Sequence, residues 1–212
     1  MSVVTIRGQE GSGASKIGRL IAESLHADFI DREIIGKVAD RLRWPDHEVA
    51  AKEMPPGSLM GRIAEAFGRS GLALDIMRPD LPTWEIQLGD TLYISGLRSV
   101  ITELVKNQPV VIQGRGSQYI LKGYPESLHI LTVAPLELRV KRVMEKLQAN
   151  QDSARKEITR IDDSRREFIK RYFGADQDDP VYYDLVINTE HFTFGDAASI
   201  AVQAARFAEL WK

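Results

Sequence analysis

A glycine-rich segment near the start of the chain, Gly8-Gln9-Glu10-Gly11-Ser12-Gly13-Ala14-Ser15-Lys16, constrains the fold more than any other feature. It follows a β-branched run at residues 3–6 and precedes residues 15–26, where apolar side chains recur at helical spacing. Glycines let consecutive backbone N–H groups point into one concavity, and the following helix adds unpaired donors and a positive dipole end. This segment, the glycine loop (residues 8–16), therefore predicts a phosphate site. A tight turn without a ligand is the alternative.

The glycine loop matches the P-loop pattern except at one position. Four residues separate Gly8 from Gly13, and Ser15 falls where the magnesium-binding hydroxyl normally lies, but Ala14 replaces the usual lysine. Lys16 is no simple substitute, because two positions along a helix rotate a side chain by about 200°. We expect Ser15 to bind the metal. The predicted nucleotide-binding residues are Gly8, Gly11, Ser12, Gly13, Ala14, Ser15 and Lys16.

Strand and helix patterns alternate along most of the chain. Strand patterns occur at residues 3–6, 27–30, 110–112, 128–133 and 184–187. Helix patterns occur at residues 15–26, 34–42, 135–148, 152–172 and 196–211. Residues 45–107 are mainly helical by pattern, with no clear strand. Strands separated by helices imply parallel pairing with right-handed crossovers, so we predict one α/β domain of three layers over residues 1–212.

Composition narrows the classes of protein. The 212 residues include no cysteine, which excludes disulfide scaffolds and thiolate metal sites. A net charge of -2 is too balanced for a dedicated nucleic-acid coat, and no window approaches the roughly 18 apolar residues of a membrane span. The first residues lack the pattern of a secretory signal. We therefore expect a soluble, cytoplasmic protein with neither a nucleic-acid nor a membrane partner.

Three stretches resemble the cytidylate kinase-like family, a branch of the P-loop nucleoside monophosphate kinases. They are residues 6–13 with 29–33, residues 113–117, and residues 163–172 with 179–189. The resemblance implies a P-loop kinase fold with a five-stranded parallel sheet, a helical monophosphate-binding insert at residues 45–107 and a mobile helical lid at residues 150–176. It also accommodates Ala14, because a small residue is common at the lysine position in this family.

Basic residues concentrate in the predicted lid and just before it. From Arg139 to Arg171 there are eleven Lys and Arg residues against six Asp and Glu residues, in a protein of net charge -2. Phosphoryl transfer spreads negative charge over the transferred oxygens, and arginines stabilise it. We predict Arg160, Arg165 and Arg166 as catalytic residues. The alternative is an exposed helix with ordinary intrahelical ion pairs, such as one between Asp162 and Arg165.

Two turns at predicted strand ends hold candidate acceptor-binding residues. Arg115 follows the strand at residues 110–112, and Asp31 follows the strand at residues 27–30. Ligands of open α/β sheets bind at the carboxyl ends of strands. We assign Arg115 and Arg32 to the acceptor phosphate and Asp31 to the acceptor sugar or base; an N-cap is the other interpretation of Asp31.

The leading functional hypothesis is ATP-dependent phosphoryl transfer to a nucleoside monophosphate, with Mg²⁺ and with CMP or dCMP as the first guess. The predicted strand ends offer no clear general base, and a phosphate ester, with a second pKa of about 6, needs none near pH 7. The alternatives are a nucleotide-binding regulatory protein, suggested by Ala14 and Gly116, and a kinase for a non-nucleotide small molecule. We expect the apolar residues between 59 and 77 to pack in the core; the alternative is that some of them form the contact of a homo-oligomer.

Overall fold

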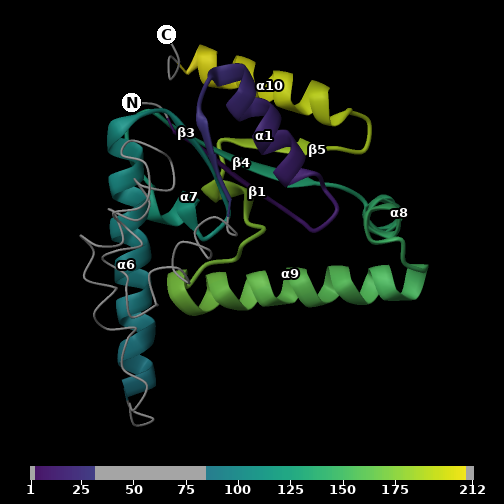
Figure 1. The fold of residues 1–212 in the computed structure, drawn as a ribbon, viewed down its shortest axis with the longest axis horizontal. Coiled ribbons are helices and arrows are strands. Elements are labelled where there is room, and N and C mark those ends of the chain that lie inside the picture. The colour runs from purple at the N-terminus through teal and green to yellow at the C-terminus, as the bar shows by residue number, and fades with distance from the viewer. Residues whose placement is uncertain (1–2, 32–84, 209–212) are drawn as a thin grey trace, which may run out of the picture. The chain divides into compact units, whose positions relative to one another are not determined.

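A five-stranded sheet organises the computed structural model, which describes residues 3–31 and 85–208 (Figure 1). The strand order is β2-β3-β1-β4-β5, and β1 pairs in parallel with both β3 and β4, as β4 does with β5. The strands are β1 (Val3–Gly8), β2 (Asp28–Ile30), β3 (Val110–Gln113), β4 (Ser127–Val133) and β5 (Leu185–Asn188). The predicted α/β class and the central first strand are confirmed.

The chain divides into two compact units. The larger comprises residues 2–29 and 109–212, and the smaller comprises residue 1 and residues 30–108. Within the smaller unit the structure describes one long helix, α6 (Glu85–Asn107), on which Val100, Ile101 and Val105 are fully buried. The predicted helix at 34–42 and residues 45–84 of the predicted insert lie outside the described residues.

Helices of the larger unit surround the sheet. They are α1 (Ala14–Leu25), α7 (Ser117–Ile120), α8 (Leu136–Leu147), α9 (Gln151–Phe173), the 3-10 turn η1 (Pro180–Tyr182) and α10 (Phe194–Phe207). The main core joins α1 and α10 to the sheet through side chains such as Ile6, Ile17, Ile130 and Ala201. Burying such branched side chains stabilises the unit by about 1.5–3 kcal/mol each. This core fixes the start of α1 at the carboxyl end of β1 (Figure 1).

The two arginine-rich helices pack against each other. Val140 and Val143 of α8 form a second core cluster with Ala154 and Ile158 of α9. Asn150 caps α9 by accepting a hydrogen bond from the Ser153 amide at 2.9 Å. The cap and the apolar cluster fix the first half of α9, so that its second half extends toward the end of β1.

The described strands and the helices α1, α8 and α9 begin and end within about two residues of the predicted boundaries, whereas α10 ends at Phe207 instead of residue 211. The short helix α7 and the 3-10 turn η1 were not predicted, and α6 lies within the block at residues 45–107 that was predicted to be mainly helical. In residues 3–31 and 85–208, no helix combines the length and the apolar character that crossing a membrane requires.

Candidate phosphate-binding site

The backbone of the glycine loop is held by its carbonyl groups. The Gln9 carbonyl accepts from the Ser12 amide at 3.0 Å and the Ser12 hydroxyl at 2.7 Å, and the Ser12 carbonyl accepts from the Thr189 hydroxyl at 2.9 Å. Three further carbonyls accept from arginines: Gly8 from Arg165 at 3.1 Å, Glu10 from Arg139 at 3.2 Å and Gly11 from Arg142 at 3.3 Å. Five successive carbonyl oxygens are thus bound by surrounding groups, and these hydrogen bonds hold the backbone of the loop in place.

Close packing makes glycine necessary at two loop positions. Gly13 has a φ of 95°, and a Cβ atom there would lie 2.3 Å from the Phe194 ring. Gly11 has a φ of 86°, and a Cβ atom there would lie 2.8 Å from the Arg139 carbonyl oxygen. Left-handed backbone without a side chain lets successive N–H groups converge. Both positions therefore require glycine.

Helix α1 begins directly behind this turn. Gly13 is its N-cap and supplies no side-chain hydrogen bond, so the first-turn amides of α1 lack both an intrahelical acceptor and a side-chain cap. Ala14 is buried, whereas Ser15 and Lys16 are exposed. The Lys16 ammonium lies 5.8 Å from the centroid of the Phe194 ring, beside α10. In this structure the Lys16 ammonium therefore lies beside an aromatic ring.

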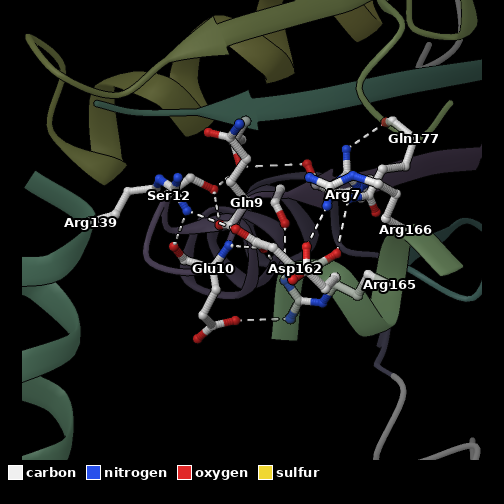
Figure 2. Close-up of polar contacts among 12 residues, drawn as sticks. Arg7, Gln9, Glu10, Ser12, Arg139, Asp162, Arg165, Arg166 and Gln177 are labelled. Atoms are coloured by element: carbon white, nitrogen blue, oxygen red, sulfur yellow. Dashed lines mark hydrogen bonds and ion pairs between the residues drawn. The ribbon is translucent and has the colours of Figure 1, made fainter. Parts of the chain in front are cut away.

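Helix α9 places the guanidinium of Arg165 beside the glycine loop (Figure 2). Its guanidinium donates from Nη1 to the Gly8 carbonyl at 3.1 Å and from Nη2 to the Glu10 carboxylate at 2.9 Å. Asp162, three residues earlier, lies 3.8 Å from Nη1. The structure thus brings one predicted catalytic arginine to the first residues of the glycine loop.

Asp162 connects the glycine loop to both arginine-rich helices. One carboxylate oxygen accepts from the Glu10 amide at 2.8 Å, and the other accepts from Arg139 Nη1 at 2.8 Å. The two side chains are nearly buried, with 13% of Asp162 and 11% of Arg139 exposed. Arg139 also donates from Nε to the Ala134 carbonyl at 3.1 Å. Sequence reasoning considered Asp162 only as a partner of Arg165 and missed Glu10 and Arg139, whose partners lie far away in the chain.

The other two predicted catalytic arginines lie in local pairs. Arg160 donates to both carboxylate oxygens of Glu157, at 2.8 and 2.7 Å, and Arg166 bonds to Asp163. Half or more of each arginine side chain is exposed. In this structure each guanidinium is thus bound one turn back along its own helix, as the intrahelical alternative predicts, while Arg165 alone of the three contacts the glycine loop.

The structure describes two of the three residues that were predicted to bind the acceptor, Arg115 and Asp31. Arg115 has a φ of 59° and lies in the turn after β3, where the Gly114 amide donates to the Ile6 carbonyl at 3.1 Å. This hydrogen bond places the turn beside the end of β1. Asp31 is buried, with 8% exposed, and Arg32 lies outside the described residues.

A buried arginine in β1 was not predicted as part of the site. Arg7 is 6% exposed, and its Nη1 donates to the Gln177 carbonyl at 2.5 Å and to Asp178 at 2.6 Å. The Tyr183 hydroxyl donates to the same carbonyl at 2.6 Å, and burial raises the pKa of this phenol. These contacts fasten the segment after α9 to the strand that precedes the glycine loop. The signal in the sequence is a charged residue inside a buried strand whose other residues are uncharged.

The described residues contain no cluster of three or more metal-ligating side chains. Magnesium usually keeps several waters and binds one or two protein groups together with substrate phosphates. An exposed serine hydroxyl at the start of α1 fits that mode, so Ser15 is a suitable single ligand.

Comparison with known proteins gives a consistent result. A family model described as the cytidylate kinase-like family matches residues 3–191. A cytidylate kinase of Staphylothermus marinus is 28% identical over 190 residues, which cover 90% of this chain and 88% of that protein. A cytidylate kinase of Methanocaldococcus jannaschii is 26% identical over 194 residues, covering 88% of each.

A solved structure shares the fold. The crystal structure of an uncharacterized protein from Eubacterium ventriosum matches with a TM-score of 0.68 and 16% identity, over 97% of this chain and 99% of the other. At this identity the match concerns the fold alone.

Proposed function

We propose that this chain, which belongs to the cytidylate kinase-like family, catalyses ATP-dependent phosphoryl transfer to a nucleoside monophosphate, with CMP or dCMP as the preferred acceptor. The observation that carries the proposal is the meeting of three groups: the turn of the glycine loop, the uncapped start of α1 and the guanidinium of Arg165. Amides at a helix start and a guanidinium are donors that bind phosphate oxygens, and this chain places both at the glycine loop.

The residues of this chain would act mainly by binding and by charge. Amides of Gly13, Ala14 and Ser15 would hold phosphate oxygens, and Arg165 would stabilise the negative charge that develops on the transferred group. A magnesium ion, bound through Ser15 and water, would neutralise further phosphate charge. The nearly buried Asp162–Arg139 pair would keep α9 beside the loop while Arg165 engages the substrate.

The acceptor would bind at the neighbouring strand ends. Arg115 and Arg32 are proposed to bind the acceptor phosphate, and Asp31 the sugar or base. A nucleoside monophosphate carries a second pKa of about 6, so its attacking oxygen is already largely ionised near pH 7. The reaction then requires orientation and cationic stabilisation, which arginines supply, and no general base.

A second candidate is a nucleotide-binding protein with little or no kinase activity. The observation in its favour is the missing cation at Ala14, combined with a Lys16 side chain that lies beside Phe194. Such a protein would bind ATP or ADP on the same loop and release no product. The third hypothesis is a kinase for a non-nucleotide small molecule. If the acceptor is an alcohol, this enzyme would require a general base near the acceptor site.

An ADP-release assay with CMP, dCMP, UMP, AMP, GMP and several small alcohols separates these functions. Magnesium-dependent turnover highest with CMP or dCMP supports the proposal. ATP binding without turnover on any acceptor selects the nucleotide-binding protein, and turnover on an alcohol alone selects the third hypothesis. Arg155→Ala is the matched control for Arg165→Ala, because Arg155 is an ion-paired arginine of the same helix whose partner, Glu137, lies on α8.

A further inference from the structure

A carboxylate inside the glycine loop binds the arginine that the proposed reaction needs. Glu10 is the third residue of the loop, and its side chain is 15% exposed. Its Oε2 atom accepts from Arg165 Nη2 at 2.9 Å, and its Oε1 atom lies 3.4 Å from Lys146 Nζ (Figure 2 shows the first pair). The loop thus contains a carboxylate next to the groups that are proposed to bind phosphate.

The ion pairs that hold α9 to the loop differ in how readily another anion can replace the carboxylate. The Asp162 carboxylate uses both oxygens, one on the Glu10 amide and one on Arg139, and both side chains are nearly buried. The Arg165 side chain is 26% exposed and holds Glu10 through one nitrogen. Water and solutes reach this pair more easily than the Asp162–Arg139 pair, so it is the contact that an arriving anion can replace.

We propose that Glu10 is a positioning residue for Arg165: it holds the guanidinium beside the glycine loop until a nucleotide phosphate takes its place. This inference rests on the proposed function, because it presupposes that phosphate binds in the loop. A phosphate is a stronger partner than a carboxylate, since it carries more charge and offers more acceptor oxygens. The exchange therefore proceeds toward phosphate without breaking the attachment of α9.

Lys146 lets Glu10 release Arg165 without becoming an unpaired charge. The Lys146 ammonium is 69% exposed and already lies near the other oxygen of the carboxylate. A flexible lysine can follow the carboxylate as it turns away from the loop, whereas a planar guanidinium matches phosphate geometry. The two cations around Glu10 thus have different roles: one is exchanged and one stays.

Calorimetric titration with ADP tests the proposal in a binding assay that needs no turnover. Glu10→Gln keeps the backbone contacts of residue 10 and removes the charge, so ADP affinity should rise about threefold to tenfold. Glu10→Asp keeps the charge but shortens the reach to Arg165, and it should also raise the affinity, by a smaller factor. Glu157→Gln, which removes a carboxylate from the distant pair with Arg160, should leave the affinity unchanged.

A second pair of variants separates positioning from simple charge repulsion. In an Arg165→Gln background, Glu10→Gln should give no gain in ADP affinity, because the exchanged partner is gone. A gain of the same size in that background, or a Glu10→Asp variant equal to wild type, would mean that Glu10 only repels phosphate, and the proposal would be overturned. Equal or weaker binding by Glu10→Gln would overturn it as well.

The outcomes also distinguish this proposal from the proposed function. If wild-type protein binds ADP and Glu10→Gln binds it no more tightly, the positioning role fails and the kinase proposal stands. If neither wild type nor Glu10→Gln binds ADP or inorganic pyrophosphate, both fail. Hydrogen exchange of α9 in each variant confirms that the helix is still formed.

Discussion

Two faces of α9 carry the same kinds of charge and make different contacts. The inner face, Asp162 and Arg165, bonds to the glycine loop and to α8. The outer face, which is defined by its contacts and comprises Glu157, Arg160, Asp163 and Arg166, forms pairs one turn apart along the helix. Position around the helix does not separate the two sets, because Arg166 follows Asp162 by four residues and lies about 40° from it. Each set contains both acidic and basic side chains, so charge alone does not distinguish them. What separates them is a partner from a distant part of the chain, together with burial.

This difference is the reason for placing the proposed catalytic role on one arginine. An exposed intrahelical pair is worth only a few tenths of a kcal/mol, because water solvates both partners and the side chains lose rotamer freedom. The inner-face groups are partly shielded from water and hold each other in fixed positions. The proposed catalytic role therefore concentrates on Arg165.

The largest expected effect is on turnover in Arg165→Ala. Removing a guanidinium that stabilises developing charge should lower kcat by about 10²–10³-fold, with CMP or dCMP as acceptor. Initial-rate kinetics at saturating ATP and acceptor measure it. Arg155→Ala should keep kcat within about twofold of wild type. Equal losses in the two variants would show that the effect comes from disturbing α9 in general.

Neighbouring carboxylates provide the next test. Asp162→Ala leaves the Glu10 amide and the nearly buried Arg139 without their acceptor, so the free energy of unfolding should fall by about 1–3 kcal/mol. Asp163→Ala removes an exposed pair with Arg166 and should change it by less than about 0.5 kcal/mol. Urea unfolding followed by circular dichroism measures both. Similar losses in the two variants would remove the distinction between the two faces.

Turnover in outer-face variants should change less. Arg166→Ala and Arg160→Ala each break a local pair, so we expect kcat to fall by no more than about threefold. The same kinetic assay checks both. A loss in Arg166→Ala as large as that in Arg165→Ala would mean that the outer face turns toward the substrate during the reaction.

The smallest expected effect is a titration change confined to the outer face. Hydrogen bonds from Arg160 hold the pKa of the Glu157 carboxyl below its ordinary value. The stabilisation from this pair is therefore present above the ordinary pKa and is lost as the pH falls through the lowered one. Arg160→Gln should raise the pKa of Glu157, as measured by carboxyl-carbon NMR, while ADP affinity stays constant. An altered ADP affinity would connect this exposed pair to the site.

The spacing of apolar residues and glycines predicted the five strands, most of the longer helices and the glycine loop. Short apolar runs and the glycine spacing depend on nearby residues, so they predicted β1, α1 and the turn between them. The i−3 spacing also identified the approach of Asp162 to Arg165. Intrahelical geometry is nearly constant, which is why such pairs can be predicted from spacing alone.

Tertiary contacts could not be predicted in the same way. Arg165 and Glu10 are 155 residues apart, and their contact depends on how α9 crosses the end of β1. Arg139 was counted among many basic residues, because nothing in its neighbourhood indicates that it bonds to a loop carbonyl and to Asp162. The spacing of apolar residues in a sequence predicts helices and strands, but it does not predict which elements contact each other in the folded chain.

The most direct test of the account is NMR titration of the wild-type protein with ADP, pyrophosphate and adenosine. If phosphate binds between the start of α1 and Arg165, ADP and pyrophosphate should shift the amide resonances of Gly13, Ala14 and Ser15 and the guanidinium resonance of Arg165, and adenosine alone should not. Shifts of equal size with adenosine, or phosphate-dependent shifts that leave these four residues unchanged, would contradict it.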